Sequence, residues 1–537
     1  MSPTWIWAVL ASAVSVSLAM PNELQLSGSP LVALVAWVPL FWALKQTKRN
    51  SEASLLTGLF VFVTTLIQCY WLAFFKDYAF WTLMGPALVE AAFGALLGPF
   101  LRRFLQEKTV WRPFAVGALW AVYEYLRSNG FLGFPWGLAP YPFHGWLWLI
   151  QISDITGLAF LAFLVIALNV WLSDLADSLS HHEKPELTPG WVLASLTAVT
   201  ALYGAVKLMT PAPAPIAYAR LALVQQSSDP WASNGPWPSS GDRDSLREAV
   251  KLSLEGLRQS RVNMVVWSET SIRGPLQFSR PFYEYHPAGH TLMSVIRSHD
   301  AYWLFGNPYA QSPNDEDPGW VNATVLMSPA ARIVDYYGKI QQVPFAEHIP
   351  FWHIPFVRNF FKSVIGLEGS WSLGRKVTVF HLPLPRVGHQ TKATELAFST
   401  PICFEDAFPW LTRLMVQKGA QVLVNLTDDS WSKMASSEVQ HEVAARFRTV
   451  EDRVYLVRST NSGVTEMIDP WGRTVKGPLP LFRPGVLLVK VPVTERTGET
   501  FYVRFGDWLV GLFSLFLLAR LLGTTLYSWI LRRRRSS

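Results

Sequence analysis

Apolar residues are gathered into long blocks with almost no charge near both ends of the chain, and a sequence of mixed character lies between them. Blocks of this length can cross the hydrocarbon core of a bilayer, about 30 Å thick, as helices. Hydropathy places them near residues 4–20, 29–45, 54–75, 80–101, 112–127, 157–176, 190–209 and 507–530. The pattern predicts a membrane domain of about seven helices over residues 1–210 and a C-terminal membrane helix over residues 507–530.

Lysine and arginine are distributed unevenly among the connections between these blocks. Lys45, Lys48 and Arg49 follow the second block and four arginines lie in residues 531–537, whereas the connection at residues 21–29 has neither residue type. Cytoplasmic loops carry the excess of basic residues, so both chain ends, including a basic tail over residues 531–537, are expected in the cytoplasm. The region between the last two blocks then lies on the opposite face, the periplasm in a Gram-negative source.

The middle of the chain, residues 217–495, follows another pattern, in which short β-rich runs alternate with helical stretches. In one helical stretch Leu246, Val250 and Leu257 share a face, and charged residues fill the other. Such alternation predicts an α/β domain, so the expected fold is a multi-spanning helical membrane domain plus an extramembrane α/β domain. The β-rich runs lie at residues 220–225, 263–267, 302–306, 323–327, 377–382, 396–402, 422–426 and 455–459.

Composition agrees with a chain that lies partly in a membrane. Only 16% of the residues are charged, whereas a soluble domain has about 25%. The formal net charge of +7 could suggest a nucleic-acid partner, but the basic residues lie beside apolar blocks, where membrane topology places them, and we expect no such partner. The two cysteines, Cys69 and Cys403, lie in different regions, so no disulfide framework is available.

Three residues with reactive side chains follow β-rich segments of the middle domain: Glu269, Lys339 and Cys403. Strand ends in α/β sheets are where catalytic groups collect. A carboxylate can deprotonate a thiol, and an ammonium together with the backbone N–H of Phe404 can stabilise the oxyanion that forms when the thiolate attacks a carbonyl. Such a set permits acyl transfer through a thioester. Taken singly, however, a core cysteine and solvated surface charges are the commoner interpretations, and spacing does not decide between them.

The segments around these residues resemble the nitrilase (carbon–nitrogen hydrolase) superfamily, in which Glu, Lys and Cys occur in this order at strand ends. Together with the flanking membrane blocks, the chain resembles the apolipoprotein N-acyltransferase family over essentially its whole length. Further matching motifs lie at Gly133–Trp136, Gln151–Gly157, Val343–His348 and Arg458–Val464. The resemblance implies an αββα sandwich for the middle domain.

The resemblance also implies roles for individual residues. Glu269 would be the general base, Lys339 the oxyanion stabiliser and Cys403 the nucleophile that carries the acyl group. Two carboxylates would orient Lys339 and the incoming groups, and three rings would line an acyl pocket; these residues are Glu347 and Glu405, and Phe404, Trp231 and Trp431. Plain core packing is an equally good interpretation of the three rings.

Two positions depart from the family pattern. Phe404 follows the cysteine where the family often has Tyr, which removes a hydroxyl but keeps the ring. Asp428 precedes Asp429 where the family often has Asn before Asp. These departures affect the expected substrate contacts and leave the three catalytic candidates unchanged.

The reaction that the resemblance implies has two steps. Cys403 would take an acyl chain from a phospholipid as a thioester, and the α-amine of the diacylglyceryl-cysteine at the N-terminus of an apolipoprotein would then receive it. Ping-pong kinetics follow from this scheme, which completes bacterial lipoprotein maturation. The implied partners are the phospholipid donor, the apolipoprotein acceptor and the bilayer of the inner membrane, and neither a cofactor nor a metal is expected.

Two other functions remain open from the residues. A membrane-tethered amidase that hydrolyses a small amide would use the same three side chains, but it has no need for the dense apolar stretch at residues 351–361. We interpret that stretch, and residues 278–285, as arms that dip into a membrane interface, with burial as core segments the alternative. A transporter or receptor with an exported sensing domain would require charged residues inside the spans, where Glu90 and Glu124 are among the few candidates.

Overall fold

The computed structural model describes residues 2–75, 79–232, 237–285, 290–315, 317–365, 369–384, 394–495 and 498–536. The chain divides into two compact units. The first comprises residues 1–70, 82–209 and 505–537, and the second comprises residues 71–81 and 210–504. The side chains of the basic tail predicted over residues 531–537 lie outside the described part of the chain.

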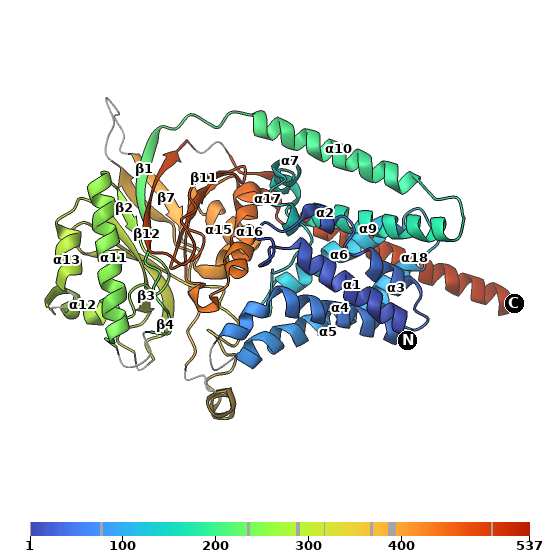
Figure 1. The fold of residues 1–537 in the computed structure, drawn as a ribbon, viewed down its shortest axis with the longest axis horizontal. Helices are drawn as coiled ribbons and strands as arrows, with labels where there is room; N and C mark the ends of the chain where they lie inside the picture. The colour runs from blue at the N-terminus through green and yellow to red at the C-terminus, as the bar shows by residue number, and fades with distance from the viewer. Residues whose placement is uncertain are drawn as a thin grey trace. The chain divides into compact units, whose positions relative to one another are not determined.

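The first unit consists of helices that follow the apolar blocks of the sequence (Figure 1). Each predicted block contains at least one helix, as expected for segments that must satisfy their own backbone hydrogen bonds in a bilayer. The helices are α1 (Pro3–Ala19), α2 (Pro30–Ala33), α3 (Val38–Lys45), α4 (Asn50–Gln68), α5 (Ala79–Leu105), α6 (Arg112–Ser128), α7 (Leu147–Ile150), α8 (Ser153–Thr156), α9 (Ala159–Ser180), α10 (Thr188–Met209) and α18 (Trp508–Ser536).

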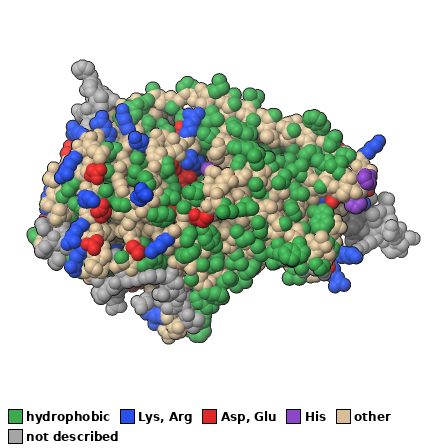
Figure 2. Space-filling model, in the orientation of Figure 1, with side chains coloured by type: hydrophobic (Ala, Val, Ile, Leu, Met, Phe, Trp, Pro, Cys, Tyr) green, Lys and Arg blue, Asp and Glu red, His purple; other side chains and the backbone are tan. Residues whose placement is uncertain are grey.

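Four of these helices, α4, α5, α9 and α10, are long and apolar enough to cross a membrane, among the residues that the structure describes. Shorter apolar helices lie at Pro3–Ala19, Pro30–Lys45 and Trp508–Gly523. Hydrophobic side chains cover the helices of this unit on the face drawn in Figure 2. These features are those of a membrane protein, and the count of about eight spans stays a prediction.

A buried ion pair fixes the connection that follows α6. The guanidinium of Arg127 lies 3.1 Å from Glu90 Oε2 in α5 and donates to the carbonyl of Trp136 at 2.8 Å. Glu124 accepts the backbone N–H of Ala139 at 2.8 Å. Buried charges need such partners, because an unpaired charge is strongly destabilising. The two carboxylates inside the apolar blocks therefore have a structural use, which weakens the case for a transport pathway.

The third apolar block ends earlier as a membrane helix than the sequence predicts. Helix α4 stops at Gln68, and the short helix η1 (Tyr70–Phe74) follows it. From Trp71 onward the segment belongs to the second unit, where the Trp71 indole N–H donates to Gln440 Oε1 at 3.0 Å. An indole N–H would have no hydrogen-bond partner in the hydrocarbon of a membrane. The hydrogen bond to Gln440 therefore favours a place for Trp71 in the second unit rather than in a membrane helix.

The second unit contains two six-stranded sheets. The first has the order β12-β1-β2-β3-β4-β5 and the second β11-β10-β9-β8-β7-β6, and in each sheet three neighbouring strands, β1–β3 or β7–β9, run parallel. The strands are β1 (Ala217–Gln225), β2 (Met264–Val266), β3 (Tyr302–Ala310), β4 (Trp320–Met327), β5 (Ile333–Gly338), β6 (Phe380–Leu384), β7 (Thr394–Ser399), β8 (Val422–Thr427), β9 (Tyr455–Thr460), β10 (Glu466–Ile468), β11 (Thr474–Lys476) and β12 (Gly485–Val493).

Helices cover the outer faces of both sheets, which gives the αββα layers of the expected sandwich (Figure 1). The sheets face each other, and the Ser459 hydroxyl of β9 donates to the carbonyl of Val266 in β2 at 3.0 Å. The helices of this unit are α11 (Ser240–Gln259), α12 (Leu276–Tyr285), α13 (His290–Arg297), α14 (Pro355–Phe360), α15 (Pro409–Gln417), α16 (Ala435–Asp452) and α17 (Phe501–Phe505), with the short segments η4 (Phe361–Ile365), η5 (Cys403–Ala407) and η6 (Ser430–Ser432).

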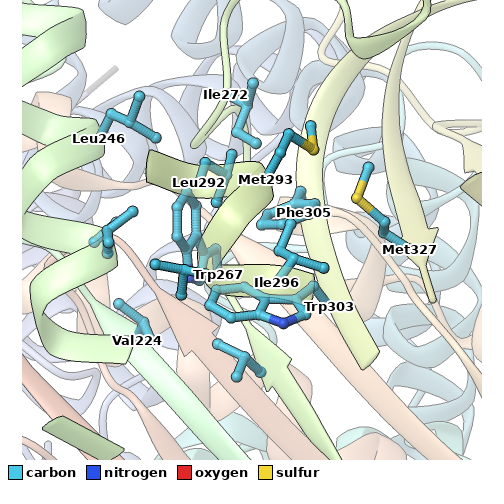
Figure 3. Close-up of a cluster of buried hydrophobic side chains, with 14 of the residues drawn as sticks. Val224, Leu246, Trp267, Ile272, Leu292, Met293, Ile296, Trp303, Phe305 and Met327 are labelled. Carbon is cyan, nitrogen blue, oxygen red and sulfur yellow. The ribbon is translucent and has the colours of Figure 1, made fainter. Parts of the chain in front are cut away.

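An aromatic cluster anchors α11 and α13 to the first sheet (Figure 3). Trp267 meets Phe305 edge-to-face at 4.9 Å between ring centroids and Trp303 at 5.9 Å. Its indole N–H donates to Ser253 of α11 at 2.9 Å, so the buried polar atom is satisfied. All three rings are fully buried. The cluster holds Trp267, which directly follows β2 and lies two residues before Glu269.

Gly306 packs closely against the backbone that follows β2, so a side chain at this position is expected to destabilise the protein. A Cβ added to Gly306 would lie 2.2 Å from the backbone nitrogen of Thr270 and 2.6 Å from the Cα of Glu269. We expect Gly306→Ala to lower the free energy of unfolding by about 1–3 kcal/mol, because backbone atoms must shift. Thermal unfolding of the full-length protein in detergent measures it.

The matched control is Gly485→Ala in β12, where the nearest atom to an added Cβ is a side-chain carbon of Leu479 at 3.4 Å. This control should change the free energy of unfolding by no more than about 0.5 kcal/mol. Equal stability of the two variants would contradict the close contact at Gly306.

Candidate active site

The structure places the three catalytic candidates at the ends of strands of both sheets. Glu269 lies three residues after β2, Lys339 directly follows β5, and Cys403 opens η5 after β7. Lys339 Nζ lies 3.2 Å from Glu269 Oε1 and 5.5 Å from the ring centroid of Phe404. Residues from widely separated parts of the sequence therefore meet in one cluster.

Lys339 is completely buried, and its ammonium is held between two carboxylates. Besides Glu269, Glu347 Oε1 accepts from Lys339 Nζ at 2.7 Å. Burial alone would lower the pKa of Lys339, but the negative charges of Glu269 and Glu347 raise it well above its ordinary value. The lysine is therefore a permanent cation, suited to stabilise negative charge that develops beside it.

Both carboxylates around Lys339 have further partners that fix their orientation. Asn322 of β4 donates to Glu269 Oε1 at 2.7 Å and to Glu347 Oε1 at 3.4 Å. The backbone N–H of Asp428 donates to Glu269 Oε2 at 3.1 Å. Burial raises the pKa of Glu269 and Lys339 opposes this rise, with the net shift upward. Glu269 is thus a stronger base than an exposed glutamate.

Cys403 lies at a strained point of the backbone. Its φ is +52°, in the left-handed region that residues with a side chain rarely adopt. The side-chain amide of Asn425 in β8 donates to the carbonyl of Cys403 at 2.9 Å and holds this turn. Burial and then Glu269 raise the pKa of the thiol well above its ordinary value, against the opposing charge of Lys339. The resting thiol is therefore protonated at neutral pH.

Glu405 ties the segment after Lys339 to the turn that carries Cys403. Its side chain is fully buried and accepts the backbone N–H groups of Ile340, Gln341 and Ile402 at 2.7, 2.9 and 2.7 Å. The hydroxyl of Tyr337 donates to it at 3.0 Å. Burial raises the pKa of Glu405 to about 7, although the backbone donors lower it. The hydrogen bonds of Glu405 thus run to the main chain beside Lys339 and Cys403, and the charge of Lys339 also lowers the pKa of its carboxyl.

The three predicted pocket aromatics lie in two places. Trp231 and Trp431 each meet Phe75 edge-to-face, with ring centroids 5.2 Å apart, and Trp431 also contacts Trp71 at 5.5 Å. Phe404 instead packs edge-to-face on Phe408 at 5.0 Å. The sequence pattern missed Trp71 and Phe75, because they close an apolar block that was interpreted as a membrane helix.

A cavity of about 180 Å³ opens beside Glu269. Ser228, Thr270, Arg273 and Asp428 are among the residues that line it. Polar and apolar residues contribute about equally to its lining, and the cavity has room for a small group next to the candidate base. Among the described residues, no group of three or more His, Cys, Asp or Glu side chains is arranged to hold a metal ion.

Sequence reasoning missed several residues that shape the site. Asn322 and Tyr337 are single polar residues within strands, and nothing in their spacing distinguishes them from other strand residues. His441 lies on the buried face of α16, where it contacts Asp429 and Asp406. Only the Asp428–Asp429 pair had a signal, as a departure from the family pattern.

The two predicted arms differ in exposure. In the stretch at residues 351–361, Phe351 and Phe356 are 66% and 79% exposed. In the second arm Tyr285 is exposed, whereas Tyr283 is buried and donates its hydroxyl to the carbonyl of Gly274 at 3.3 Å. The second arm is therefore in part a core segment, because α12 turns one face toward the aromatic cluster of the first sheet.

Comparison with known proteins gives the family. The model of the apolipoprotein N-acyltransferase N-terminal domain matches residues 12–171, and the carbon–nitrogen hydrolase model matches residues 220–498. Apolipoprotein N-acyltransferase 2 of Treponema pallidum is 35% identical over 95% of this chain and 93% of its own length, and its namesake in Treponema denticola is 32% identical over 93% and 94%.

Among solved structures, an amidase from Nesterenkonia sp. aligns with 53% of this chain and 96% of its own at 15% identity and a TM-score of 0.35, values that add nothing to the assignment. The relatives from Treponema match nearly the full length of this chain, and the two family models cover both its apolar N-terminal part and its α/β part. The chain therefore belongs to the apolipoprotein N-acyltransferase family, and residues 220–498 form its carbon–nitrogen hydrolase domain.

Proposed function

We propose that this protein transfers an acyl chain from a phospholipid, through a thioester on Cys403, to the α-amine of the diacylglyceryl-cysteine of an apolipoprotein. The family membership supports this reaction, which would complete the maturation of bacterial lipoproteins. One observation carries the assignment of the site: a fully buried ammonium, Lys339, is clamped by Glu269 and Glu347 next to the turn that presents a thiol. Neither a cofactor nor a metal takes part in the proposed scheme.

In the first step, Glu269 takes the proton of the Cys403 thiol, and the sulfur attacks the ester carbonyl of the phospholipid. The carbonyl oxygen becomes an oxyanion, which the Lys339 ammonium and the backbone N–H of Phe404 stabilise. When the tetrahedral intermediate collapses, the carbon–oxygen ester bond breaks and Glu269 returns the proton to the departing oxygen. The products are a lysophospholipid and the thioester enzyme.

In the second step, the α-amine of the apolipoprotein attacks the thioester carbonyl. Glu269 takes a proton from the nitrogen, the carbon–sulfur bond breaks, and the thiolate of Cys403 recovers its proton from Glu269. The acyl chain leaves as an amide, and the enzyme returns to its resting state. Because the donor leaves before the acceptor reacts, the kinetics are ping-pong.

Five further residues support this chemistry. Glu347 holds the Lys339 ammonium directly, and Glu405 fixes the backbone around it through its three N–H partners. Phe404 lies beside the ammonium, and Trp231 and Trp431 surround Phe75. We assign these three aromatic residues to the path of the acyl chain, since large rings offer apolar area that a hydrocarbon chain can cover.

The membrane setting follows from the same proposal, because donor and acceptor both reside in a bilayer. We propose an inner-membrane protein whose membrane domain spans residues 1–210 and whose last membrane helix spans residues 507–530. The catalytic domain, residues 217–495, would lie on the periplasmic face, with both chain ends, including the tail at 531–537, in the cytoplasm. The exposed phenylalanines of residues 351–361 would contact the bilayer interface.

The thioester predicts a direct labelling experiment. Purified full-length protein is incubated with a phospholipid that carries a labelled acyl chain, and we expect a label on the protein that hydroxylamine removes. Cys403→Ala should lose this label, and Cys69→Ala should keep it, because Cys69 is buried and belongs to the first unit. A wild type that never acquires label would overturn the proposal, and release of ammonia from small amides would then favour an amidase.

The role of Glu269 predicts a large kinetic effect from a small change. Glu269→Gln keeps the shape of the side chain, and Glu347 still pairs with Lys339, so we expect a folded protein. Formation of the acyl-enzyme should slow by about 10²–10⁴-fold, the usual contribution of a general base. The matched control is Glu395→Gln, whose carboxylate is 56% exposed and should not affect the rate. A wild-type rate in Glu269→Gln would exclude it as the base.

The exposed phenylalanines predict an effect that depends on the membrane. Phe356→Glu should slow acyl transfer from phospholipid vesicles at least about tenfold, because a buried phenyl ring contributes about 1.5–3 kcal/mol to membrane contact. Alkylation of Cys403 by a water-soluble reagent should be unchanged. Val475→Glu changes another exposed apolar residue, in β11, and should leave both measurements as in wild type. Equal losses in the two variants would contradict a specific interfacial role for α14.

A further inference from the structure

The hydrogen-bond partner that the structure gives the Cys403 thiol is not the candidate base. Cys403 Sγ lies 3.9 Å from Oδ1 of Asp429, within the distance at which an S–H group donates to oxygen. Both oxygens of Glu269 accept other donors, Oε1 from Asn322 and Lys339 and Oε2 from the backbone of Asp428. Asp429 thus faces the reacting sulfur in the resting enzyme.

Asp429 is itself held by a chain of buried charges that the proposed reaction does not use. Its Oδ2 lies 2.5 Å from His441 Nδ1, and His441 Nε2 lies 2.8 Å from Asp406 Oδ1. The guanidinium of Arg458 donates to the other oxygen of Asp406. His441, Asp406 and Arg458 are completely buried or nearly so. We call these four residues, Asp429, His441, Asp406 and Arg458, the Asp429 network.

The charge state of the histidine follows from its two neighbours. Each ring nitrogen of His441 faces a carboxylate, and only an imidazolium can donate from both nitrogens. Burial alone would lower the pKa of His441, but Asp429 and Asp406 raise it to about 10. The same pairing lowers the pKa of Asp429 against the effect of burial. The network is therefore an alternating row of charges, with a carboxylate at the end that contacts the sulfur.

We propose that Asp429 accepts the S–H of resting Cys403 and orients the sulfur, and that His441, Asp406 and Arg458 are positioning residues that hold the Asp429 carboxylate in place. The inference rests on the proposed role of Cys403 as nucleophile. The four residues come from four separate elements, namely the turn after β8, α16, η5 and β9. Their side chains converge behind one thiol, which random core packing of charged residues does not explain, since buried charge is costly.

The network has an electrostatic consequence for the thiol. A carboxylate next to sulfur disfavours the thiolate, and the imidazolium of His441 partly offsets that charge. Asp429 therefore keeps the thiol protonated and aimed until a substrate is present, when Glu269 takes the proton. The other charged groups that face Cys403 are Glu269, Lys339 and Glu347, and those that face Asp429 besides His441 are Arg458, Lys339, Glu269 and Glu438.

The test measures the pH dependence of Cys403 alkylation by iodoacetamide, on the full-length protein in detergent with Cys69→Ala as the background. Asp429→Asn removes a negative charge beside the sulfur, so the midpoint of alkylation should move to lower pH by about one unit. His441→Asn leaves the Asp429 charge without its partner, so the midpoint should move to higher pH. If the Asp429 network only stabilised the fold, the alkylation midpoints of Asp429→Asn and His441→Asn would not be expected to shift in opposite directions.

Controls separate this inference from loss of fold and from the proposed function. Asp428→Asn changes the neighbouring carboxylate, whose oxygen accepts from Ser430 and Asn461 rather than from the thiol, and should leave the midpoint unchanged. If thermal unfolding shows that His441→Asn does not fold, His441→Gln removes the same positive charge with a longer side chain and should also raise the midpoint. An unchanged midpoint in Asp429→Asn, or shifts of one sign in both variants, would overturn the inference.

The alkylation readout does not require acyl transfer, so the two proposals fail separately. If the wild type never takes an acyl label but the alkylation midpoints of the variants shift in opposite directions, the proposed reaction is wrong and the role of Asp429 is supported. If the wild type is labelled normally but the midpoints do not shift, the proposed reaction is supported and the role of Asp429 is wrong.

Discussion

Lys339 carries a positive charge to a position with no exposed surface, and the architecture of the site follows from that burial. An ammonium taken out of water is several kcal/mol less stable unless opposite charges and hydrogen bonds replace the lost hydration. Glu269 and Glu347 supply the charge, and Asn322 fixes both carboxylates. The compensation leaves a cation that cannot be neutralised, next to a strained turn with a protonated thiol. This combination suits the acyl transfer that we propose.

The two sheets make this convergence possible. Strand ends from both sheets meet where the sheets face each other, so residues far apart in sequence come within hydrogen-bond distance. Glu405 then joins the two sides, because one carboxylate accepts backbone donors from the segment after β5 and from the turn after β7. The fold thus positions the candidate residues through main-chain hydrogen bonds as well as through packing.

Periodicity predicted much of the fold. All eight β-rich runs overlap strands, because buried β-branched and apolar residues give a clear pattern, and the membrane domain with a nitrilase-like α/β domain is confirmed by the family models. The pattern missed β5 and β10 to β12. Strand β11 is short and exposed and β5 is partly exposed, so both carry little apolar periodicity, whereas the alternating burial of β12 was overlooked. It also extended the third membrane block through Trp71 and Phe75, which hydropathy cannot distinguish from lipid-facing residues.

The site was less accessible to such reasoning. Glu269, Lys339 and Cys403 stood out only through the family resemblance, because each type is common at strand ends, and their roles stay proposals. His441 and Asp406 had no signal at all, since their significance lies in a contact across 35 residues of sequence. Glu405 was predicted to orient Lys339, and that role stays a prediction; the hydrogen bonds of its carboxylate run to the neighbouring backbone.

The segment after α4 has a consequence for how the protein is made. Trp71 contacts Gln440, which is synthesised 369 residues later. At about 5–20 residues per second, Gln440 is made about 20–70 s after Trp71. A fragment that begins after residue 210 would lack Trp71 and Phe75, and would leave Trp231 and Trp431 without these rings. The second unit is therefore not one continuous segment of the chain. Its folding includes residues 71–81, which are synthesised before most of the helices of the first unit.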